Sequence, residues 1–264
     1  MRVILISLLL LLFSHTAFSQ ILNIERNRLK RDTTRYWTGQ VDFNLLMHNR
    51  SARLNEPIRF TSLSTNADVA YTSVLHRYTL INQLSYSALT GNAFLRTGYS
   101  HFRTNFNWRN ILSEELFAQT QYDIGRGLRE RYLAGGGLRY RLLDDEKATL
   151  TFGLGIMYEQ ERWAYPGDEN REITLRIPKN SNYLSLRWQI NEMVYLNTIM
   201  YYQHGYDKQF DIWRHRFSAD FNTAATISRR IRFTTSVNAS YDPRPVVPVV
   251  NWVYSLQNGI RFAF

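Results

Sequence analysis

The sequence predicts a transmembrane, antiparallel, up-and-down β-barrel of about twelve strands. Three observations lead to this fold class: an apolar export signal at the start, alternating apolar and polar residues through most of the chain, and a last strand with aromatic residues at both ends. Alternation suits a strand with lipid on one face and water on the other. The mean hydropathy of −0.36 agrees, because each such strand averages the two faces.

The N-terminal residues resemble a signal peptide. Met1-Arg2 gives a short positive start, and the run over 3–13 (VILISLLLLLF) is too short for a confident membrane-spanning helix. Small residues at Ala17 and Ser19 predict cleavage after Ser19, and the absence of cysteine excludes a lipoprotein signal. We therefore expect a signal peptide at 1–19, a periplasmic lead at 20–34 and a barrel at 35–264. An N-terminal membrane anchor is the alternative.

The last thirteen residues predict a membrane-spanning strand. One face is apolar and aromatic, interrupted by Asn258, and consists of Trp252, Tyr254, Leu256, Ile260, Phe262 and Phe264. The other face carries small and polar residues, as expected towards a wet lumen. The terminal Phe264 also resembles the signal that the bacterial barrel-assembly machinery recognises, so we expect that machinery to be a partner.

Period-two alternation predicts the remaining strands. It is clearest over 138–142, 148–158, 183–190, 216–227 and 230–241. Less regular strands are expected at Tyr36–Met47, Arg59–Thr72, Tyr78–Ser87, Phe94–Asn107, Leu112–Tyr122 and Val194–Gln203. Around Pro57 to Leu80 the pattern also permits one strand fewer, or a bulge.

The connections predict an orientation. Tight joints are expected at Trp108–Asn110, Asp144–Glu146, Asn191–Glu192 and Ser228–Arg229. Longer ones are expected at Asn49–Pro57, Asp123–Glu130, Arg162–Ser181, Gly205–Asp211 and Asp242–Val250. Outer-membrane barrels have short periplasmic turns and long external loops. We therefore expect the outer membrane of a Gram-negative bacterium, both termini in the periplasm, and contact with lipid and lipopolysaccharide.

The charge of the chain favours anionic partners. The precursor carries 32 basic and 22 acidic side chains, a net charge of +10. Many arginines alternate with apolar residues in strands and do not cluster on a helix, which argues against a nucleic-acid partner. Lipid phosphate or anionic solutes are the expected alternatives.

Several arginines share the presumed lumen face, mostly near the periplasmic strand ends: Arg103, Arg139, Arg141, Arg187, Arg230, Arg232 and Arg261. They could form an anion-favouring constriction. They could equally form a salt-bridged network that stiffens the wall, with Asp42, Asp68, Glu115 and Asp220 as partners. The sequence leaves both interpretations open.

No catalytic or metal-binding constellation emerges. Ser100 and His101 are adjacent, so on a strand they point to opposite faces. His204 and His215 flank a predicted rim loop with Asp207 or Asp211 nearby, and ordinary solvation is the plainer interpretation. We predict no cofactor, no metal and no catalytic residues. The glycines over 135–137, with Gly153 and Gly155, are expected to make room for bulky neighbours.

The segment over 131–161 (RYLAGGGLRYRLLDDEKATLTFGLGIMYEQE) resembles the outer-membrane family DUF481. The segments YTLINQLSYS and FLRTGYSHFRTNF upstream are similar to that family too, so the resemblance covers roughly Tyr36 to Phe264. It implies an outer-membrane barrel, some members of the family being described as salt-induced. It implies no site residues.

The expected function is a structural or channel-type barrel that passes small solutes, with anions favoured. The alternatives are an outer-membrane lipid-modifying enzyme, of lipid A deacylase or phospholipase type, and a surface receptor or adhesin that uses the predicted loop Arg162–Ser181. An enzyme needs a nucleophile and a base clustered near the lipid interface. The sequence shows no such cluster, which disfavours an enzyme.

Overall fold

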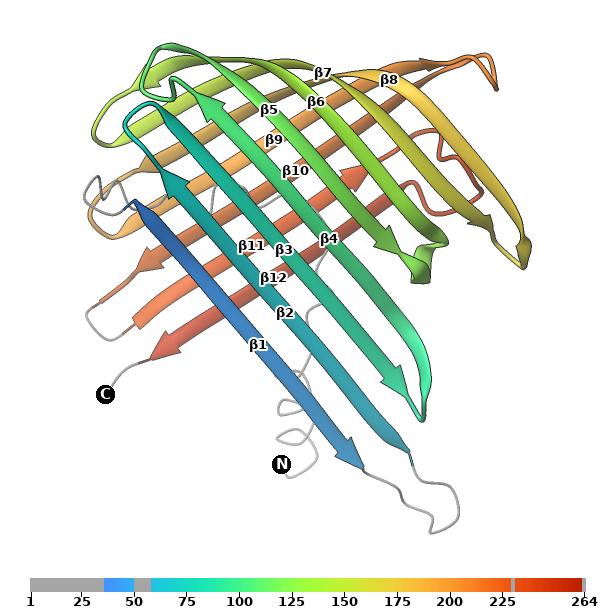
Figure 1. Ribbon diagram of the computed structural model, residues 1–264. Coiled ribbons are helices and arrows are strands. Elements are labelled where there is room, and N and C mark those ends of the chain that lie inside the picture. The colour runs from blue at the N-terminus through green and yellow to red at the C-terminus, as the bar shows by residue number, and fades with distance from the viewer. Residues whose placement is uncertain (1–35, 50–57, 229–230, 263–264) are drawn as a thin grey trace.

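The computed structural model describes residues 36–49, 58–228 and 231–262, and the predicted signal peptide and periplasmic lead lie outside these ranges. Twelve strands form one antiparallel sheet in which each strand pairs with the next along the chain (Figure 1). They are β1 (Trp37–Asn49), β2 (Arg59–Thr72), β3 (His76–Leu89), β4 (Asn92–Phe106), β5 (Leu112–Asp123), β6 (Leu128–Asp144), β7 (Ala148–Tyr165), β8 (Asp168–Gln189), β9 (Val194–Asp207), β10 (Ile212–Thr226), β11 (Ile231–Tyr241) and β12 (Trp252–Phe262). The predicted all-β, up-and-down, twelve-stranded architecture is confirmed.

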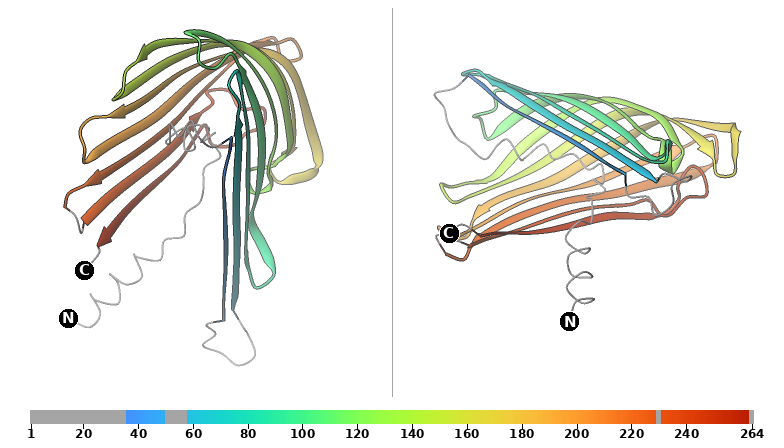
Figure 2. Two further views of the ribbon diagram at one scale, coloured as in Figure 1. Left: turned by 60° about the vertical axis from the view of Figure 1, so that its left-hand side comes forward. Right: turned by 90° about the horizontal axis from the view of Figure 1, so that it is seen from below.

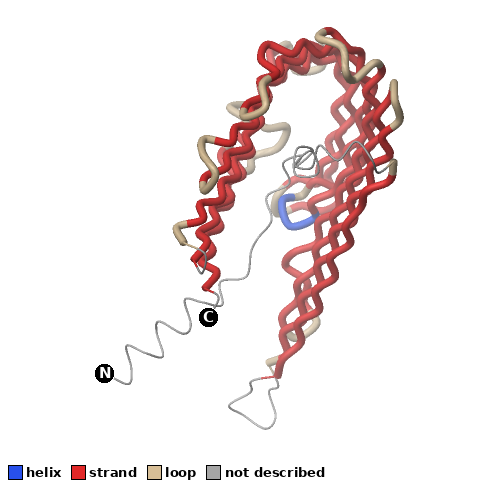
Figure 3. The backbone as a smooth tube through the Cα atoms, turned by 90° about the vertical axis from the view of Figure 1, so that its left-hand side faces the viewer, coloured by secondary structure: helices blue, strands red, loops and turns tan. Residues whose placement is uncertain are grey.

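The sheet curls into a barrel that is not fully closed. Figure 2 shows its two edges, β1 and β12, standing apart, and Figure 3 shows the opening of the curled sheet. Among the described residues, β1 pairs with β2 and β12 pairs with β11, and the two edge strands do not pair with each other. Each edge therefore presents a row of backbone N–H and C=O groups without a strand partner.

The two faces of the sheet are reversed relative to a soluble protein. On β7, the outward side chains of Phe152, Leu154 and Ile156 are 40%, 55% and 70% exposed, whereas the inward Thr151 and Glu159 are buried. Across the described residues, buried polar and charged side chains outnumber buried apolar ones, and every strand exposes large apolar side chains. The sequence pattern therefore places polar groups inside and apolar groups outside.

The predicted long loop Arg162–Ser181 is wrong, because β7 and β8 continue through it. They meet at a two-residue turn, 166–167, with Gly167 at φ 82°. The prolonged hairpin carries charged residues on its outer face, which hid the alternation. Pro178 fits because β8 pairs with β9 only from Asn180 onward, so the proline lies along an unpaired edge.

The remaining boundaries differ by a few residues from those predicted. The uncertain region before Leu80 forms two regular strands, β2 and β3, and the bulge lies later, between Ser87 and Ala88. One edge of the barrel, which we call the short-turn edge, holds residues 73–75, 107–111, 145–147, 190–193 and 227–228. The opposite edge, which holds the connection 242–251, is the loop edge. The start of β1 and the end of β12 both lie at the short-turn edge. No helix in the described part of the chain is long and apolar enough to cross a membrane.

Candidate functional site

The curled sheet surrounds a cavity of about 390 Å³, lined by both polar and apolar side chains. Near the loop edge it is lined by Asp123, Arg126 and Asn251, and deeper by Arg103, Glu115 and Tyr201. Four arginines and four carboxylates line it in all: Arg103, Arg126, Arg131, Arg216, Glu115, Asp123, Glu161 and Asp242. The lining is therefore rich in charge but balanced in sign.

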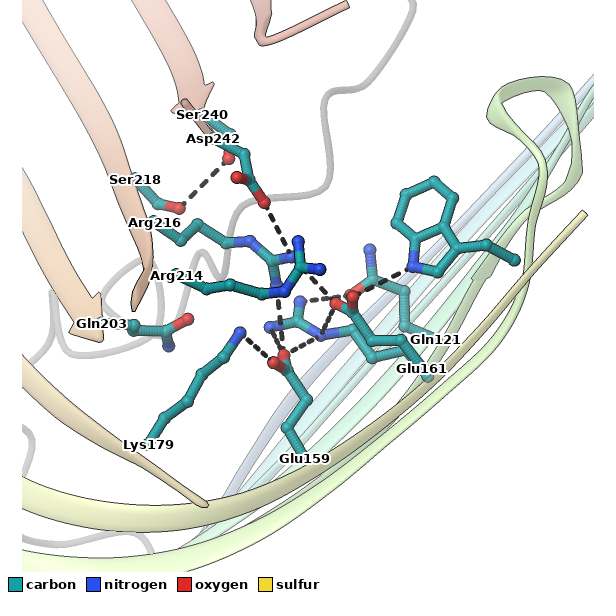
Figure 4. A network of polar contacts seen from close by, with 12 residues as sticks. Gln121, Glu159, Glu161, Lys179, Gln203, Arg214, Arg216, Ser218, Ser240 and Asp242 are labelled. Carbon is teal, nitrogen blue, oxygen red and sulfur yellow. Dashed lines mark hydrogen bonds and ion pairs between the residues drawn. The ribbon is translucent and has the colours of Figure 1, made fainter. Parts of the chain in front are cut away.

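An ion cluster crosses the lumen between the mouth and the deeper part of the cavity. We define it as Arg131 of β6, Glu159 and Glu161 of β7, Lys179 of β8, Arg216 of β10, and Asp242 just after β11. Arg216 lies 3.1 Å from Glu159, 2.9 Å from Glu161 and 3.3 Å from Asp242. Figure 4 shows Arg216 reaching towards the two glutamates from the opposite wall.

The cluster is buried, and each of its charges has an ion-pair partner. Glu159 and Glu161 are each fully buried; Arg131 and Lys179 also pair with Glu159, and Trp163 Nε1 donates to Glu161 Oε2 at 3.0 Å. Three cations face three carboxylates, so the cluster has no formal net charge. Buried charges require this pairing. The cluster ties β6, β7 and β8 to β10 across the barrel and narrows the lumen.

Arg103 forms the centre of a second polar group, closer to the short-turn edge. Its Nη1 lies 3.7 Å from Glu115 Oε2, and its Nη2 donates to the Tyr201 hydroxyl at 3.4 Å. The rings of Phe117 and Tyr183 lie 5.9 and 5.4 Å from its guanidinium carbon. At these distances the two aromatic faces attract the cation.

Gly153 makes room for one of these rings. A Cβ added at Gly153 would overlap the ring of Tyr183, whose hydroxyl donates to Glu115 Oε2 at 2.9 Å. The predicted packing role of this glycine is therefore confirmed. It lets a large aromatic side chain from the neighbouring strand lie flat along the wall, next to Arg103.

The other predicted lumen arginines do not gather at one point. Arg139 donates to Thr151 Oγ1 at 3.5 Å, and Arg187 donates to Thr149 Oγ1 at 3.0 Å. Arg141 lies at the short-turn edge, where it donates to the carbonyl of Trp108. Arg232 is exposed and donates to Thr226 Oγ1 at 3.4 Å. Arg230, the side chains of Arg261 and Phe262, and Phe264 lie outside the described residues.

Of these five described arginines, Arg103 alone lines the cavity. Its partner Glu115 is one of the four acidic residues expected to pair with lumen arginines. Asp42, another of the four, instead accepts from Gln40 at 2.7 Å on β1. On the C-terminal strand, Trp252, Tyr254, Leu256 and Ile260 are all more than half exposed, on the outward face.

The histidine pair meets on the outward face. His204 and His215 are directly opposed on β9 and β10, with ring centroids 6.4 Å apart, and contact Asn180 and Tyr202. Asp207 points inward to Arg214 instead, and Asp211 accepts from Tyr206. No group of three or more metal-binding side chains exists in the described part of the chain.

Ser100 and His101 do lie on opposite faces, as predicted. Ser100 donates to Asn82, whereas His101 is buried on the inner face against Gln119. A nucleophile and a base are therefore not brought together at this pair.

The mouth of the cavity carries one charge of each sign where β5 ends and the turn to β6 begins. Asp123 Oδ1 accepts the backbone N–H of Arg126 at 3.3 Å, which caps the short 3-10 helix η2 (Ile124–Arg126). The turn therefore adds no net charge to the mouth.

Sequence reasoning missed the ion cluster. Its members lie far apart along the chain, and its acidic residues stand where the alternation gives way to the predicted loop. The sequence did contain one signal, because every second residue of a strand lies on the same face. Glu159, Glu161 and Trp163 share one face of β7 with Thr151. Arg131 and Arg216 likewise lie on the inner face of their strands. The contacts themselves depend on strand register, which the pattern does not supply.

Similar solved structures are β-sheet membrane proteins. The NanC porin matches with a TM-score of 0.41 and 15% identity, over 77% of this chain and 94% of that one. The β domain of the Bordetella autotransporter BrkA matches with a TM-score of 0.30 and 12% identity, over 86% of this chain and 98% of that one. A loop-deletion mutant of OmpT, an outer-membrane protein of Vibrio cholerae, matches with a TM-score of 0.26 and 9% identity, over 85% and 99% of the two chains.

No curated protein shows significant similarity to the sequence. The family described as "Protein of unknown function, DUF481" matches residues 59–246, from the start of β2 to the segment after β11. This range holds both the ion cluster and Arg103 with its partners. On this match, the chain belongs to the DUF481 family.

Proposed function

We propose that this protein is an outer-membrane barrel that passes small polar solutes along a narrow lumen. The observation that carries the proposal is the reversed sheet: large apolar side chains exposed on the outside of every strand, and charged and polar side chains around an internal cavity. Exposed apolar surface of this extent is excessive for a soluble monomer. A bilayer around the sheet accounts for it.

We infer the orientation from the connections. The ten-residue connection 242–251, the longest in the described part of the chain, lies at the loop edge, together with the β7–β8 hairpin. In outer-membrane barrels the short turns face the periplasm. We therefore place both ends of the barrel in the periplasm and the cavity mouth outside. The exposed strand faces would contact lipid and lipopolysaccharide, and β12 would be read by the barrel-assembly machinery.

The lumen geometry limits what could pass. The ion cluster spans the bore, and Tyr183 and Tyr201 lie below it, so the open space is small. Because the cluster cations are neutralised by its carboxylates, they give the bore little charge preference. A small, polar solute fits these walls, and a large one does not.

Planar-bilayer recording on the refolded protein tests passage. We expect small conductance steps for the wild type. Replacing Arg216 and Glu161 together with glutamine keeps the net charge but removes the ties across the bore, so the steps should become larger. A wild type that carries no current while giving a folded, SDS-resistant gel band would contradict passage and leave a structural role.

Membrane insertion also predicts that β1 and β12 pair. An unpaired backbone group in lipid costs several kcal/mol, so two long free edges are not tolerated there. The chain has no cysteine, so single introduced pairs are unambiguous. We expect Asn44→Cys to form a disulfide in vesicles with one of Val253→Cys, Ser255→Cys or Gln257→Cys, and to give a faster-migrating band without reductant.

A second pair of cysteines, on strands that are not neighbours, serves as the control for this test. Asn44→Cys with Asn182→Cys should not cross-link, because β8 lies far from β1 in the strand order. If no β1–β12 pair cross-links in protein that is folded in vesicles, the barrel remains open at this seam.

A further inference from the structure

The floor of the cavity holds a cation whose hydrogen-bond donors are only partly used. Arg103 is 3% exposed, and its Nε and Nη1 make no hydrogen bond in the described part of the chain. Buried guanidinium groups normally use their five N–H donors. The hydrogen bond from Arg103 to Tyr201 is long, at 3.4 Å, compared with 2.7–2.9 Å for a charge-assisted bond.

The nearby carboxylate does not complete the site. Glu115 Oε2 lies 3.7 Å from Arg103 Nη1, and it already accepts from Asn105 at 3.2 Å and from Tyr183 at 2.9 Å. Glu115 therefore supplies countercharge at a distance without satisfying the arginine donors. Arg103 lines the deep end of the cavity, so its guanidinium group borders the space that a solute would occupy.

A second unsatisfied group defines the other end of the ligand. His101 is 1% exposed, lines the same cavity, and its Nε2 has no hydrogen-bond partner in the described part of the chain. Gln119 Nε2 donates to Gln121, which leaves Gln119 Oε1 to accept from His101 Nδ1 at 3.2 Å. This network assigns the proton to Nδ1 and leaves Nε2 as an acceptor for a hydroxyl donor.

The two groups lie at neighbouring inward positions of one strand, which favours a small ligand. His101 and Arg103 are two residues apart on the inner face of β4, which separates their Cα atoms by ~7 Å. A ligand that carries a carboxylate and a hydroxyl group on one six-membered ring has dimensions of this order. The aromatic faces of Phe117 and Tyr183 flank the arginine and offer apolar surface to the carbon skeleton.

We propose that this cavity binds a small hydroxylated carboxylate, with the carboxylate on Arg103 and a hydroxyl group on His101. This inference rests on the proposed passage of small solutes, and it names the chemical class of solute that the cavity would bind. Arg103 and His101 are binding residues in this proposal, and the ion cluster above them limits the size of what arrives.

Calorimetric titration of the refolded full chain in detergent micelles tests the site without requiring conduction. The probes are glucuronate, glucose (which lacks the carboxylate) and inorganic phosphate (which lacks the ring and its hydroxyl groups). We expect glucuronate to bind at least about 10-fold more tightly than either. Equal binding of glucose and glucuronate would overturn the carboxylate assignment, and equally tight phosphate would overturn the hydroxy-acid assignment.

Variants locate the binding. Arg103→Gln should weaken the binding of glucuronate at least about 10-fold. Arg103→Lys keeps the charge but loses the planar guanidinium group that can bind a carboxylate with two hydrogen bonds, so it should weaken the binding severalfold. Arg187→Gln is the matched control, because Arg187 is an inward arginine that does not line the cavity. His101→Leu should weaken the binding of glucuronate. It should leave the binding of acetate, a further probe that has a carboxylate and no hydroxyl group, unchanged. If folded Arg103→Lys and Arg103→Gln both bind glucuronate like the wild type, the site is not at Arg103.

The two proposals fail separately. A protein that conducts but does not distinguish glucuronate from glucose supports passage and overturns the binding site. A protein that binds glucuronate through Arg103 but carries no current supports the site and overturns passage.

Discussion

Replacing Glu159 with glutamine should lower the free energy of unfolding by about 3–5 kcal/mol. The side chain is fully buried and pairs with Arg131, Lys179 and Arg216. The amide keeps the shape but removes the charge, which leaves the cluster with one uncompensated buried cation. Urea unfolding of the protein in lipid vesicles, followed by tryptophan fluorescence, measures the change.

An exposed ion pair provides the control for this prediction. Glu130 lies 3.2 Å from Arg162, at side-chain exposures of 27% and 44%. Because solvent screens such a pair, Glu130→Gln should change stability by less than about 1 kcal/mol. Equal effects of the two substitutions would show that the ion cluster does not brace the barrel.

The second large effect concerns the outward face. Ile156 is 70% exposed near the middle of β7, so in water an arginine there would be harmless. In a bilayer, Ile156→Arg should cost about 2–4 kcal/mol, because the charge would lie near the midplane. Vesicle-embedded unfolding experiments measure this cost against the wild type.

The cost of an arginine substitution should depend on its depth in the bilayer, and this dependence distinguishes contact with lipid from a general packing effect. Ile58 is 50% exposed and lies just before β2 at the loop edge. There the same substitution should cost only about 0–1 kcal/mol, since the interface hydrates the charge. If Ile156→Arg is as mild as Ile58→Arg in vesicles, the outward face does not meet the hydrocarbon core.

The strands could be predicted because their side chains alternate with period two. The predicted strand Arg59–Thr72 matches β2, and the outward aromatics of the C-terminal strand are exposed as expected. The alternation failed over 162–181, where the hairpin bears charges on its outer face. Local composition there resembles a solvated loop, and only pairing between β7 and β8 reveals the strands.

The site was less accessible to sequence reasoning, for a geometric reason. The inward placement of Arg103, Arg139 and Arg187 follows from the alternation of residues between the two faces of a strand, which can be read from the sequence. Their depth and partners depend on the register between strands, which spreads the arginines along the lumen. Contacts such as Arg216 with Glu159, 57 residues apart, follow from that register and from the curl of the sheet.

Spin-label accessibility along β7 tests the central claim most directly, namely that this sheet has lipid outside and water inside. Single cysteines at Thr151, Leu154, Ile156 and Met157 would carry nitroxide labels in protein refolded into vesicles. Labels at Leu154 and Ile156 should collide more with oxygen, which concentrates in lipid, and those at Thr151 and Met157 should not. Greater accessibility of Leu154 and Ile156 to a water-soluble nickel chelate would contradict the account.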